Sequence, residues 1–265
     1  MTWKILITND DGIYSSGIKA SYEALKDLGE VYVVAPAVQM SGVGRSMSIM
    51  KPVRVSHVHF DGMDGYAVDG TPTDSIIIGI YEIIGELPDL VVSGINMGEN
   101  VSAESVTTSG TVCAALEAAT QGCPAIAISQ QMRDEEKFEF VFKPKNFSNS
   151  KKVLRLIAEK VLKSGTPAEV LNVNVPANCE RIEFEVTRLA KRLYRTRVEE
   201  RRDPRGRTYY WISGVEVEDS EPGTDIHALR SGKVSITPLT IDLTAKNLKD
   251  VEAWFNTNMN IAKYG

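Results

Sequence analysis

The sequence predicts an α/β fold: a Rossmann-like, doubly wound and mostly parallel sheet, followed by a C-terminal β-rich lobe. Two observations predict the sheet. Apolar runs of strand length alternate with amphipathic helical patterns, which is the βαβ rhythm of a parallel sheet. The first run ends abruptly on Asp10, Asp11 and Gly12. Ligands of such folds bind where the strands end, so we expect functional groups at this edge.

The bulk composition is that of an ordinary globular protein. The chain has 265 residues, of which 43% are hydrophobic and 25% are charged. The composition shifts near Ile182 to alternating strand patterns, so we expect a Rossmann-like core over 1–180 and an extension over 181–265. A net charge of −5 argues against a general binder of nucleic acid or of anionic membranes.

The cysteines and the N-terminus bear on location. Cys113, Cys123 and Cys179 are scattered without a C-x-x-C pair, which argues against a disulfide framework and a zinc site and favours a reducing interior. The opening apolar run is too short for a signal sequence or a membrane span, and it ends in charge. We therefore predict a cytoplasmic protein.

The first helix and the strand after it follow from capping residues and periodicity. Ser15 or Ser16 can cap a helix that runs to about Leu28, where Gly29 provides the stop. The apolar run 31–36 is then a buried strand. This helix between two strands sets the parallel arrangement of the sheet.

The next segments form the edge of the sheet and a capped helix. Residues 47–68 have the pattern of β-structure at the sheet's edge, with a turn at 61–62. Thr71, Pro72 and Asp74 form a helix start, and we interpret Asp74 as part of a capping box alone.

The later elements are expected from the same signals. They are strands over 89–93, 124–129 and 170–176, the last closing the core sheet, helices over 112–119 and 148–163, a hairpin around 195–210, a short helix over 224–230, a strand over 234–239 and a helix over 246–255. The stretch 130–146 shows no clear period.

The adjacent acids Asp10 and Asp11 are the first candidate site. Like charges repel, and their burial is costly unless a cation or hydrogen-bond donors compensate them. A hard metal ion held at a strand end and a solvated Asp-Asp-Gly turn explain the pair equally well when this stretch is considered alone.

Two further motifs follow later strands. Residues 94–98 have the spacing of a nucleophile elbow, but Asn96 stands where the serine would be, and an amide is not that nucleophile. Asn96 can offer its oxygen to a cation or its NH2 group to a phosphate. Ser109, Gly110 and Thr111 precede a helical run, which suits a phosphate-binding helix start or an ordinary N-cap. Taken alone, the cap is the favoured interpretation.

Two other patterns are interpreted as structural. His57 and His59 share one strand face, but no third nitrogen or sulfur ligand is near in sequence, so we prefer an exposed strand face to a metal site. In the hairpin around 195–210, acidic residues interrupt the arginines, which favours a solvated or intersubunit hairpin over a nucleic-acid site. Projecting strands pair readily with other strands, so we expect the C-terminal half to build an oligomer.

The motifs of the chain also form a recognisable order. They are T-N-D-D-G-I at 8–13, A-P at 35–36 with the loop 39–46, G-T-P-T-D-S at 70–75, S-G-I-N-M-G at 93–98, S-G-T-V at 109–112, A-A-L-E at 114–117, D-P-R-G at 203–206, Y-Y-W at 209–211 and S-I-T-P-L at 235–239. In this order, and over nearly the whole chain, they resemble the SurE family of stationary-phase survival proteins and 5′-nucleotidases.

The resemblance implies a metal-dependent phosphomonoesterase that acts on nucleoside 5′-monophosphates, with 3′-monophosphates and short polyphosphate as further candidates. It also implies a homodimer or homotetramer assembled through the C-terminal half. It places the metal ligands on Asp10, Asp11, Ser41 and Asn96. This all-oxygen set suits Mg²⁺ or Mn²⁺, one ion per subunit, rather than zinc. Asp10 and Asp11 would jointly bind the metal and activate water, and Asn96 with the helix start at 109–111 would hold the phosphate.

Two departures from the family pattern and two rival functions accompany the resemblance. The loop 99–104 lacks the usual glycine- and aspartate-containing sequence, and Thr108 stands where a tyrosine is usual, which leaves the substrate preference open. A haloacid-dehalogenase-type phosphatase would need a nucleophilic aspartate where Asn9 stands. A nucleotide-sensing binding protein without turnover would share the fold, but the complete set of metal ligands argues against it.

Overall fold

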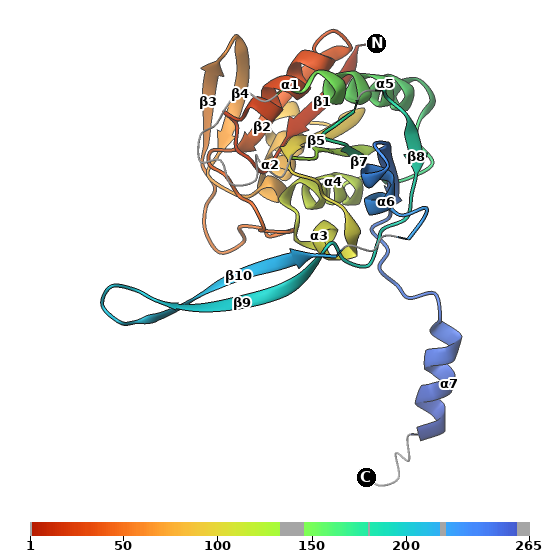
Figure 1. Ribbon diagram of the computed structural model, residues 1–265. Coiled ribbons are helices and arrows are strands. Elements are labelled where there is room, and N and C mark those ends of the chain that lie inside the picture. Colours follow the sequence, from red (N-terminus) through yellow and green to blue (C-terminus); the bar gives the residue numbers. More distant parts are fainter. Residues whose placement is uncertain (1, 133–145, 180, 218–220, 259–265) are drawn as a thin grey trace, which may run out of the picture.

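The core of the protein is one nine-stranded sheet that runs through the middle of the molecule (Figure 1). The structure is a computed structural model, and it describes residues 2–132, 146–179, 181–217 and 221–258. The strands lie in the order β3 (Val55–Phe60), β4 (Met63–Val68), β2 (Gly29–Pro36), β1 (Trp3–Thr8), β5 (Leu90–Met97), β6 (Ala125–Gln130), β7 (Val170–Val175), β11 (Val234–Leu239) and β8 (Phe184–Val186). From β4 to β7 every neighbouring pair is parallel, which confirms the doubly wound α/β fold.

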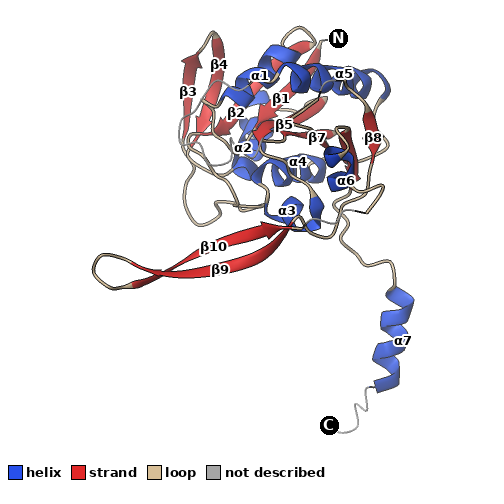
Figure 2. Ribbon diagram, viewed as in Figure 1, coloured by secondary structure: helices blue, strands red, loops and turns tan. Residues whose placement is uncertain are grey.

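Two layers of helices cover the two faces of the sheet (Figure 2). The layers are α1 (Ser16–Leu25) with α5 (Ser148–Ser164) and, on the other face, α2 (Pro72–Ile78) with α4 (Gly110–Thr120). Side chains of β1 serve both layers, because Ile5 and Ile7 pack in the core beside α1 and α5 whereas Leu6 packs in the opposite core. Burial on both faces explains why these strands are continuous apolar runs.

The predicted helix caps are present. Ser15 caps α1, and its hydroxyl accepts a hydrogen bond from the N–H of Ile18 at 3.3 Å. Thr71 and Asp74 form the capping box of α2, which continues into the π-helix η1 (Gly79–Ile84). Asp74 therefore has the expected capping role but not that role alone, because its Oδ1 also accepts a hydrogen bond from the backbone N–H of Ser48 at 2.9 Å.

Several boundaries differ from those expected. α1 ends at Leu25 rather than near Leu28, and Gly29 is the first residue of β2. A Cβ at Gly29 would lie 2.2 Å from the carbonyl oxygen of Trp3, so glycine permits close pairing with β1 instead of stopping the helix. α3 (Ser102–Thr108) lies where a loop was expected. β7 does not close the sheet, because β11 and β8 follow it.

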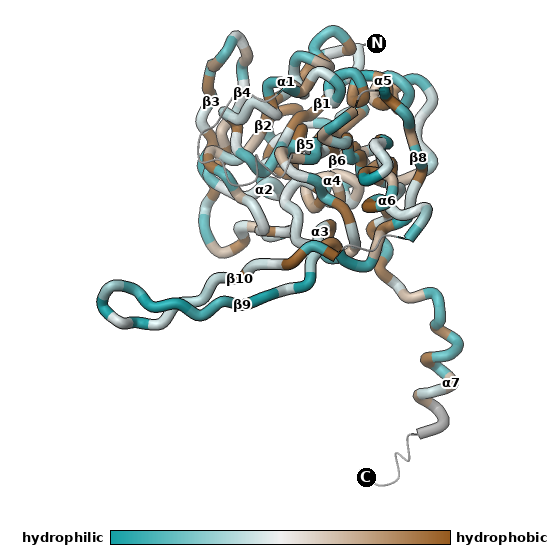
Figure 3. Tube along the Cα trace, in the orientation of Figure 1, coloured by the Kyte–Doolittle hydropathy of each residue, from teal (hydrophilic) through white to brown (hydrophobic). Residues whose placement is uncertain are grey.

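The region 181–265 divides between the body of the protein and two projecting elements. β8, β11 and α6 (Asp225–Arg230) belong to the body. β9 (Tyr194–Arg202) and β10 (Thr208–Glu216) form a separate hairpin that extends away from it, as does α7 (Leu248–Asn258) in another direction (Figure 1). Every residue of β10 is exposed, and Figure 3 shows that β9 is mostly hydrophilic whereas much of β10 is of intermediate hydropathy. The long hairpin and the final helix are thus confirmed as elements.

The remaining expectations concern histidines, cysteines and membrane spans. His57 and His59 are exposed on β3, as expected. The three cysteines are free and buried. In the ranges that the structure describes, no helix is both long and apolar enough to cross a membrane. Most of the stretch 130–146 lies outside the described residues.

Candidate active site

The turn after β1 is held by its own asparagine. Asn9 is fully buried, and its Nδ2 donates to the carbonyl oxygen of Gly12 at 3.1 Å and to Oγ of Ser15 at 2.6 Å. Gly12 has a φ of +94°, and a Cβ there would lie 3.2 Å from the carbonyl carbon of Val38. Glycine therefore suits the place where this turn meets the loop after β2. Asn9 supports the turn and is no nucleophile, which argues against a haloacid-dehalogenase-type phosphatase.

Asp10 lies against the start of α4 and is 5% exposed. The hydroxyl of Thr111 donates to its Oδ1 at 2.5 Å. A Cβ at Gly110 would lie 2.7 Å from the Cβ of Asp10 and 2.9 Å from its Oδ2, so only glycine allows this close approach. Burial raises the pKa of Asp10, and hydrogen bonds from the Thr111 hydroxyl and from the backbone of Gly110 and Thr111 oppose that rise.

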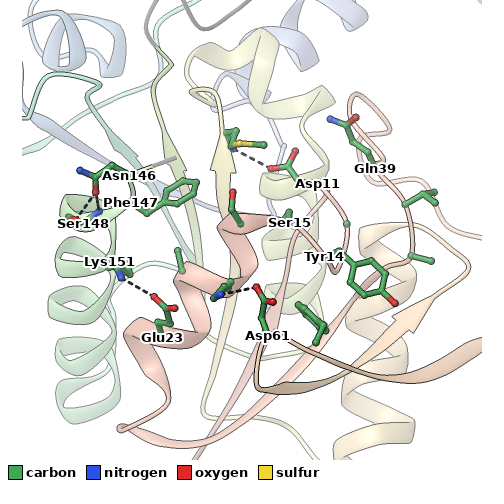
Figure 4. A pocket seen from close by; sticks show the side chains of 18 residues that line it. Asp11, Tyr14, Ser15, Glu23, Gln39, Asp61, Asn146, Phe147, Ser148 and Lys151 are labelled. Carbon is green, nitrogen blue, oxygen red and sulfur yellow. Dashed lines mark hydrogen bonds and ion pairs between the residues drawn. The ribbon is translucent and has the colours of Figure 1, made fainter. Parts of the chain in front are cut away.

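Asp11 faces a hollow on the surface (Figure 4). Its Oδ2 accepts a hydrogen bond from the backbone N–H of Met97 at 3.3 Å. Burial, and then the negative charge of Asp10, raise the pKa of Asp11 to about 6. No basic side chain of the described residues contributes to the pKa of either carboxyl group. When both carboxyl groups are ionised, their negative charges repel one another, and a cation would relieve that repulsion.

The loop after β2 brings Ser41 to the same turn. The backbone N–H of Met40 donates to the carbonyl oxygen of Asp10 at 2.7 Å. Nε2 of Gln39 donates to Oγ of Ser41 at 3.2 Å, and the Gln39 side chain also hydrogen-bonds Asp11. Ser41 is itself exposed. Met40 and Gln39 thus connect Ser41 to Asp10 and Asp11, respectively.

Arg45 anchors the other end of this loop on α4. Its Nε and Nη2 lie 2.8 and 2.7 Å from Oε2 of Glu117, which is 2% exposed. The backbone N–H of Gly44 donates to the carbonyl oxygen of Thr108 at 2.9 Å. Sequence reasoning missed this ion pair, because a charge pair between a loop and a helix 72 residues away has no short-range pattern. The loop is therefore fixed to the same helix whose start contacts Asp10.

Asn96 lies near the end of β5. Its Nδ2 donates to the carbonyl oxygen of Gly98 at 2.8 Å, which leaves the amide oxygen as the end suited to a cation. The pairing of β5 with β6 shifts register between Ser93 and Asn96, an irregularity of the kind found next to active sites. The next residue, Met97, contacts Asp11. Asn96 is thus connected to Asp11 through its neighbour Met97.

The three residues at the start of α4 have different contacts. Ser109 is the N-cap, and its Oγ accepts a hydrogen bond from the N–H of Val112 at 3.1 Å. Gly110 and Thr111 lie against Asp10. The cap was one of the two alternatives for this motif, and the proximity to Asp10 was not foreseen. A contact between this helix start and phosphate stays a prediction.

A hollow of about 870 Å³ opens beside Asp11 (Figure 4). α1 lines its middle, α5 and the turn between β3 and β4 line its flanks, and Gln39 and Met97 line it near Asp11. Sequence reasoning did not predict this hollow, because its walls come from segments that are far apart in the chain.

Comparisons with known proteins agree with this architecture. A family model described as "Survival protein SurE" matches residues 5–196. The "5′-nucleotidase SurE" of Archaeoglobus fulgidus is 66% identical over 256 residues, which cover 96% of this chain and 97% of that protein. The protein of the same name from Methanosarcina mazei is 52% identical over 253 residues, covering 93% and 95%. The crystal structure of the SurE protein from Aquifex aeolicus matches with a TM-score of 0.79 at 40% identity, over 95% of this chain and 99% of that one. The chain therefore belongs to the SurE family.

Proposed function

We infer that this chain is a 5′-nucleotidase, which hydrolyses nucleoside 5′-monophosphates to nucleoside and inorganic phosphate, and that the reaction takes place at Asp10 and Asp11. The site assignment rests on the two adjacent, largely buried carboxylates of Asp10 and Asp11. No basic residue among those described lowers the pKa of either one. The Archaeoglobus and Methanosarcina relatives, both named 5′-nucleotidase SurE, support the activity at high identity over nearly the full chain.

The residues of the site fit a divalent cation. Asp10, Asp11, Ser41 and Asn96 offer only oxygen ligands, which Mg²⁺ and Mn²⁺ prefer. The raised pKa of Asp11 supports the same conclusion, because positive charge placed beside the two carboxylates would favour their ionised forms. We assign one Mg²⁺ or Mn²⁺ ion per subunit to these four residues. When bound, the ion supplies charge neutralisation and Lewis acidity toward the phosphoryl oxygens.

The protein's own groups have separate tasks in this proposal. Thr111 and Gly110 hold Asp10 in place. Asp10 and Asp11 jointly orient the attacking water and receive its proton. Water attacks phosphorus, the bond between phosphorus and the 5′ oxygen breaks, and that oxygen leaves as the nucleoside hydroxyl with the proton that the two carboxylates received from water. Asn96 and the positive end of α4 hold the phosphoryl oxygens.

Phosphate release from AMP tests the proposal. We expect activity with Mg²⁺ or Mn²⁺ and none after exhaustive chelation. Asp10→Asn and Asp11→Asn are each expected to lower kcat/KM by at least about a hundredfold. Asp64→Asn is the matched control, because the Asp64 side chain is 69% exposed on β4 and belongs to no proposed ligand set. Full turnover in the presence of chelator, or in Asp10→Asn, would contradict the assignment.

A nucleotide-sensing protein of the same fold would give a different result. It would bind AMP, measured by isothermal titration calorimetry, without releasing phosphate under any of these conditions. Binding and phosphate release measured on the same preparation therefore separate the two functions.

We also propose that the two projecting elements of 181–265, the β9–β10 hairpin and α7, assemble the chain into a homodimer or homotetramer. On the hairpin, Tyr210, Trp211 and Ile212 are each more than half exposed, and on α7 Trp254 is 66% exposed. Large apolar side chains gathered on projecting elements mark interaction surfaces. Light scattering at micromolar concentration tests this proposal, and a monomer would contradict it.

A cytoplasmic location is proposed from the cysteines. All three are free and buried, which is usual where thiols are kept reduced. Fractionation of cells that express the chain tests the location, and recovery outside the cytoplasm would contradict it.

A further inference from the structure

We propose that the hollow beside Asp11 binds the nucleoside half of the substrate, with the base stacked on Tyr14, an assignment that rests on the proposed nucleotidase function. Tyr14 is then a specificity-determining residue rather than a catalytic one. The position of the hollow, the charges that line it and the way in which Tyr14 is held all support a nucleoside as its occupant.

The hollow is continuous with the candidate active site. Asp11, Gly12 and Gln39 line one part of it, and Tyr14 and Phe60 line another (Figure 4). Its volume of about 870 Å³ is within the usual size of small-molecule sites. Tyr14 follows Asp11 by three residues, which span at most ~11 Å of chain. A phosphate held at Asp11 therefore leaves the attached nucleoside within reach of Tyr14.

The charges of the hollow suit the neutral part of a nucleotide. Its two lysines are both paired, with Nζ of Lys19 at 2.7 Å from Oδ2 of Asp61 and Nζ of Lys151 at 2.9 Å from Oε2 of Glu23 (Figure 4). Among the lining residues, all of which the structure describes, there is no other lysine or arginine. A phosphate would find no free cation among these described lining residues, whereas ribose hydroxyls and base edges can hydrogen-bond their polar side chains.

Tyr14 presents an aromatic surface from a fixed backbone. It is 63% exposed, although the preceding Ile13 is fully buried. The backbone N–H of Ile13 donates to the carbonyl oxygen of Pro36 at 2.8 Å. Phe60 meets the Tyr14 ring edge-on, with ring centroids 5.2 Å apart and an interplanar angle of 71°. A large exposed ring beside the site offers the aromatic face that base stacking requires.

Substrates with and without a base test this proposal. We would measure kcat and KM for AMP and for ribose 5-phosphate. Stacking of one base on an aromatic ring corresponds to a factor of about 5 to 150 in affinity. Tyr14→Ala is therefore expected to raise KM for AMP by such a factor, while turnover of ribose 5-phosphate and kcat for AMP stay near the wild-type values. Tyr14→Phe keeps the ring and is expected to keep KM for AMP.

Tyr81→Ala is the matched control, because Tyr81 is a tyrosine 58% exposed on η1 that does not line the hollow. We expect it to leave both substrates unaffected. Melting temperatures and circular dichroism check that each variant is folded. Tyr14→Leu, which keeps apolar bulk but removes the ring face, repeats the test should Tyr14→Ala be unstable.

Adenosine binding, measured by calorimetry without divalent cation, gives a readout that does not depend on turnover. We expect Tyr14→Ala to weaken it by a similar factor. The proposal is overturned if Tyr14→Ala leaves both the preference for AMP over ribose 5-phosphate and the adenosine affinity unchanged. It is also overturned if the wild type neither prefers AMP nor binds adenosine. If AMP yields no phosphate but adenosine binding depends on Tyr14, the proposed reaction fails while the nucleoside site stands.

Discussion

The hydroxyl of Thr111 donates a 2.5 Å hydrogen bond to Oδ1 of Asp10, although the two residues are 101 positions apart. Thr111 is fully buried and Asp10 nearly so. The bond joins the end of β1 to the start of α4, and thereby makes one site from two separate sequence motifs. A buried carboxylate that lost this donor would keep only its backbone hydrogen bonds, from Gly110 and Thr111 among others, to offset its desolvation.

The hydroxyl of Thr111 is expected to be essential for turnover. Thr111→Val keeps the shape of the side chain and removes the donor, so we expect kcat for AMP to fall by about a hundredfold. The free energy of unfolding should fall by about 1–3 kcal/mol. Thr111→Ser retains a hydroxyl and should stay close to wild type. A Thr111→Val protein with normal kcat would show that this bond does not position Asp10 for the reaction.

Any side chain at position 110 is expected to displace Asp10. The Cβ of Gly110→Ala would lie 2.7 Å from the Cβ of Asp10, so one of the two must move. We expect at least about a tenfold loss of Mn²⁺ affinity by calorimetric titration, because a removed site partner typically costs 10–100-fold in affinity. Gly206→Ala in the hairpin is the control, because its φ of +80° strains the backbone locally but a Cβ there meets nothing within 4 Å and the residue belongs to no proposed ligand set. Unchanged Mn²⁺ affinity in Gly110→Ala would separate Asp10 from the metal site.

Substitution of Ser109 tests whether the start of α4 binds phosphate or only caps the helix. Its Oγ accepts from the N–H of Val112, which leaves its own O–H free to donate to a phosphoryl oxygen. We expect Ser109→Ala to cost about 1 kcal/mol of stability as a lost cap. We also expect it to lower kcat/KM for AMP by about a hundredfold as a lost phosphate donor. Near-normal kinetics in a less stable variant would reduce this residue to its capping role.

Arg45 is expected to support Ser41 through the loop that it anchors. Arg45→Ala leaves Glu117, which is 2% exposed, without its ion-pair partner, and such losses cost about 3 kcal/mol of stability. The double variant Arg45→Ala, Glu117→Gln removes the unpaired charge and should recover part of that stability. Because the loop keeps the backbone bond of Gly44 to Thr108 but lacks the Arg45 anchor, Mn²⁺ affinity should remain weak in both variants. Lys233→Ala, which breaks a partly exposed pair with Glu185, is the control and should cost less than about 1 kcal/mol. Wild-type Mn²⁺ affinity in Arg45→Ala would show that the anchor does not serve the site.

The pH dependence of cation binding should follow Asp11. Its pKa is raised from the ordinary 3.8 to about 6, so the folded protein without cation favours the protonated carboxyl. The folded protein holds the Asp11 proton more tightly than the unfolded chain does. Ionisation of Asp11 therefore lowers folding stability as the pH rises from about 4 through about 6, and this loss of stability is complete above pH 6. A bound cation removes this loss, so the rise in Tm on adding Mn²⁺ should be large at pH 7.5 and small at pH 5.

Asp11→Asn is the control for this titration and should lack most of the pH dependence between pH 5 and pH 7.5. An equal rise in Tm at the two pH values in the wild-type protein would contradict a role for Asp11 in holding the cation.

Several features of the fold follow from short-range interactions along the chain. The apolar run of β1 ending on Asp10 and Asp11, the Ser15 cap and the Thr71–Asp74 capping box each depend on residues within a few positions of one another. Side-chain periodicity and hydrogen bonds across one turn of chain decide such elements. The ordered motifs were sufficient to indicate the family, and comparison with relatives confirmed it.

The contacts between segments that are far apart in the chain follow from the tertiary structure alone. Periodicity shows that a helix or strand has an apolar face, but it does not say which other element covers that face. The contact of Gly110 with Asp10 and the pair of Arg45 with Glu117 therefore had no signal in the sequence. The same holds for the hollow that brings Tyr14 beside Phe60, and for the addition of β11 and β8 to the sheet. Each of these depends on long-range packing, in which the apolar surface buried by one element is supplied by another far along the chain.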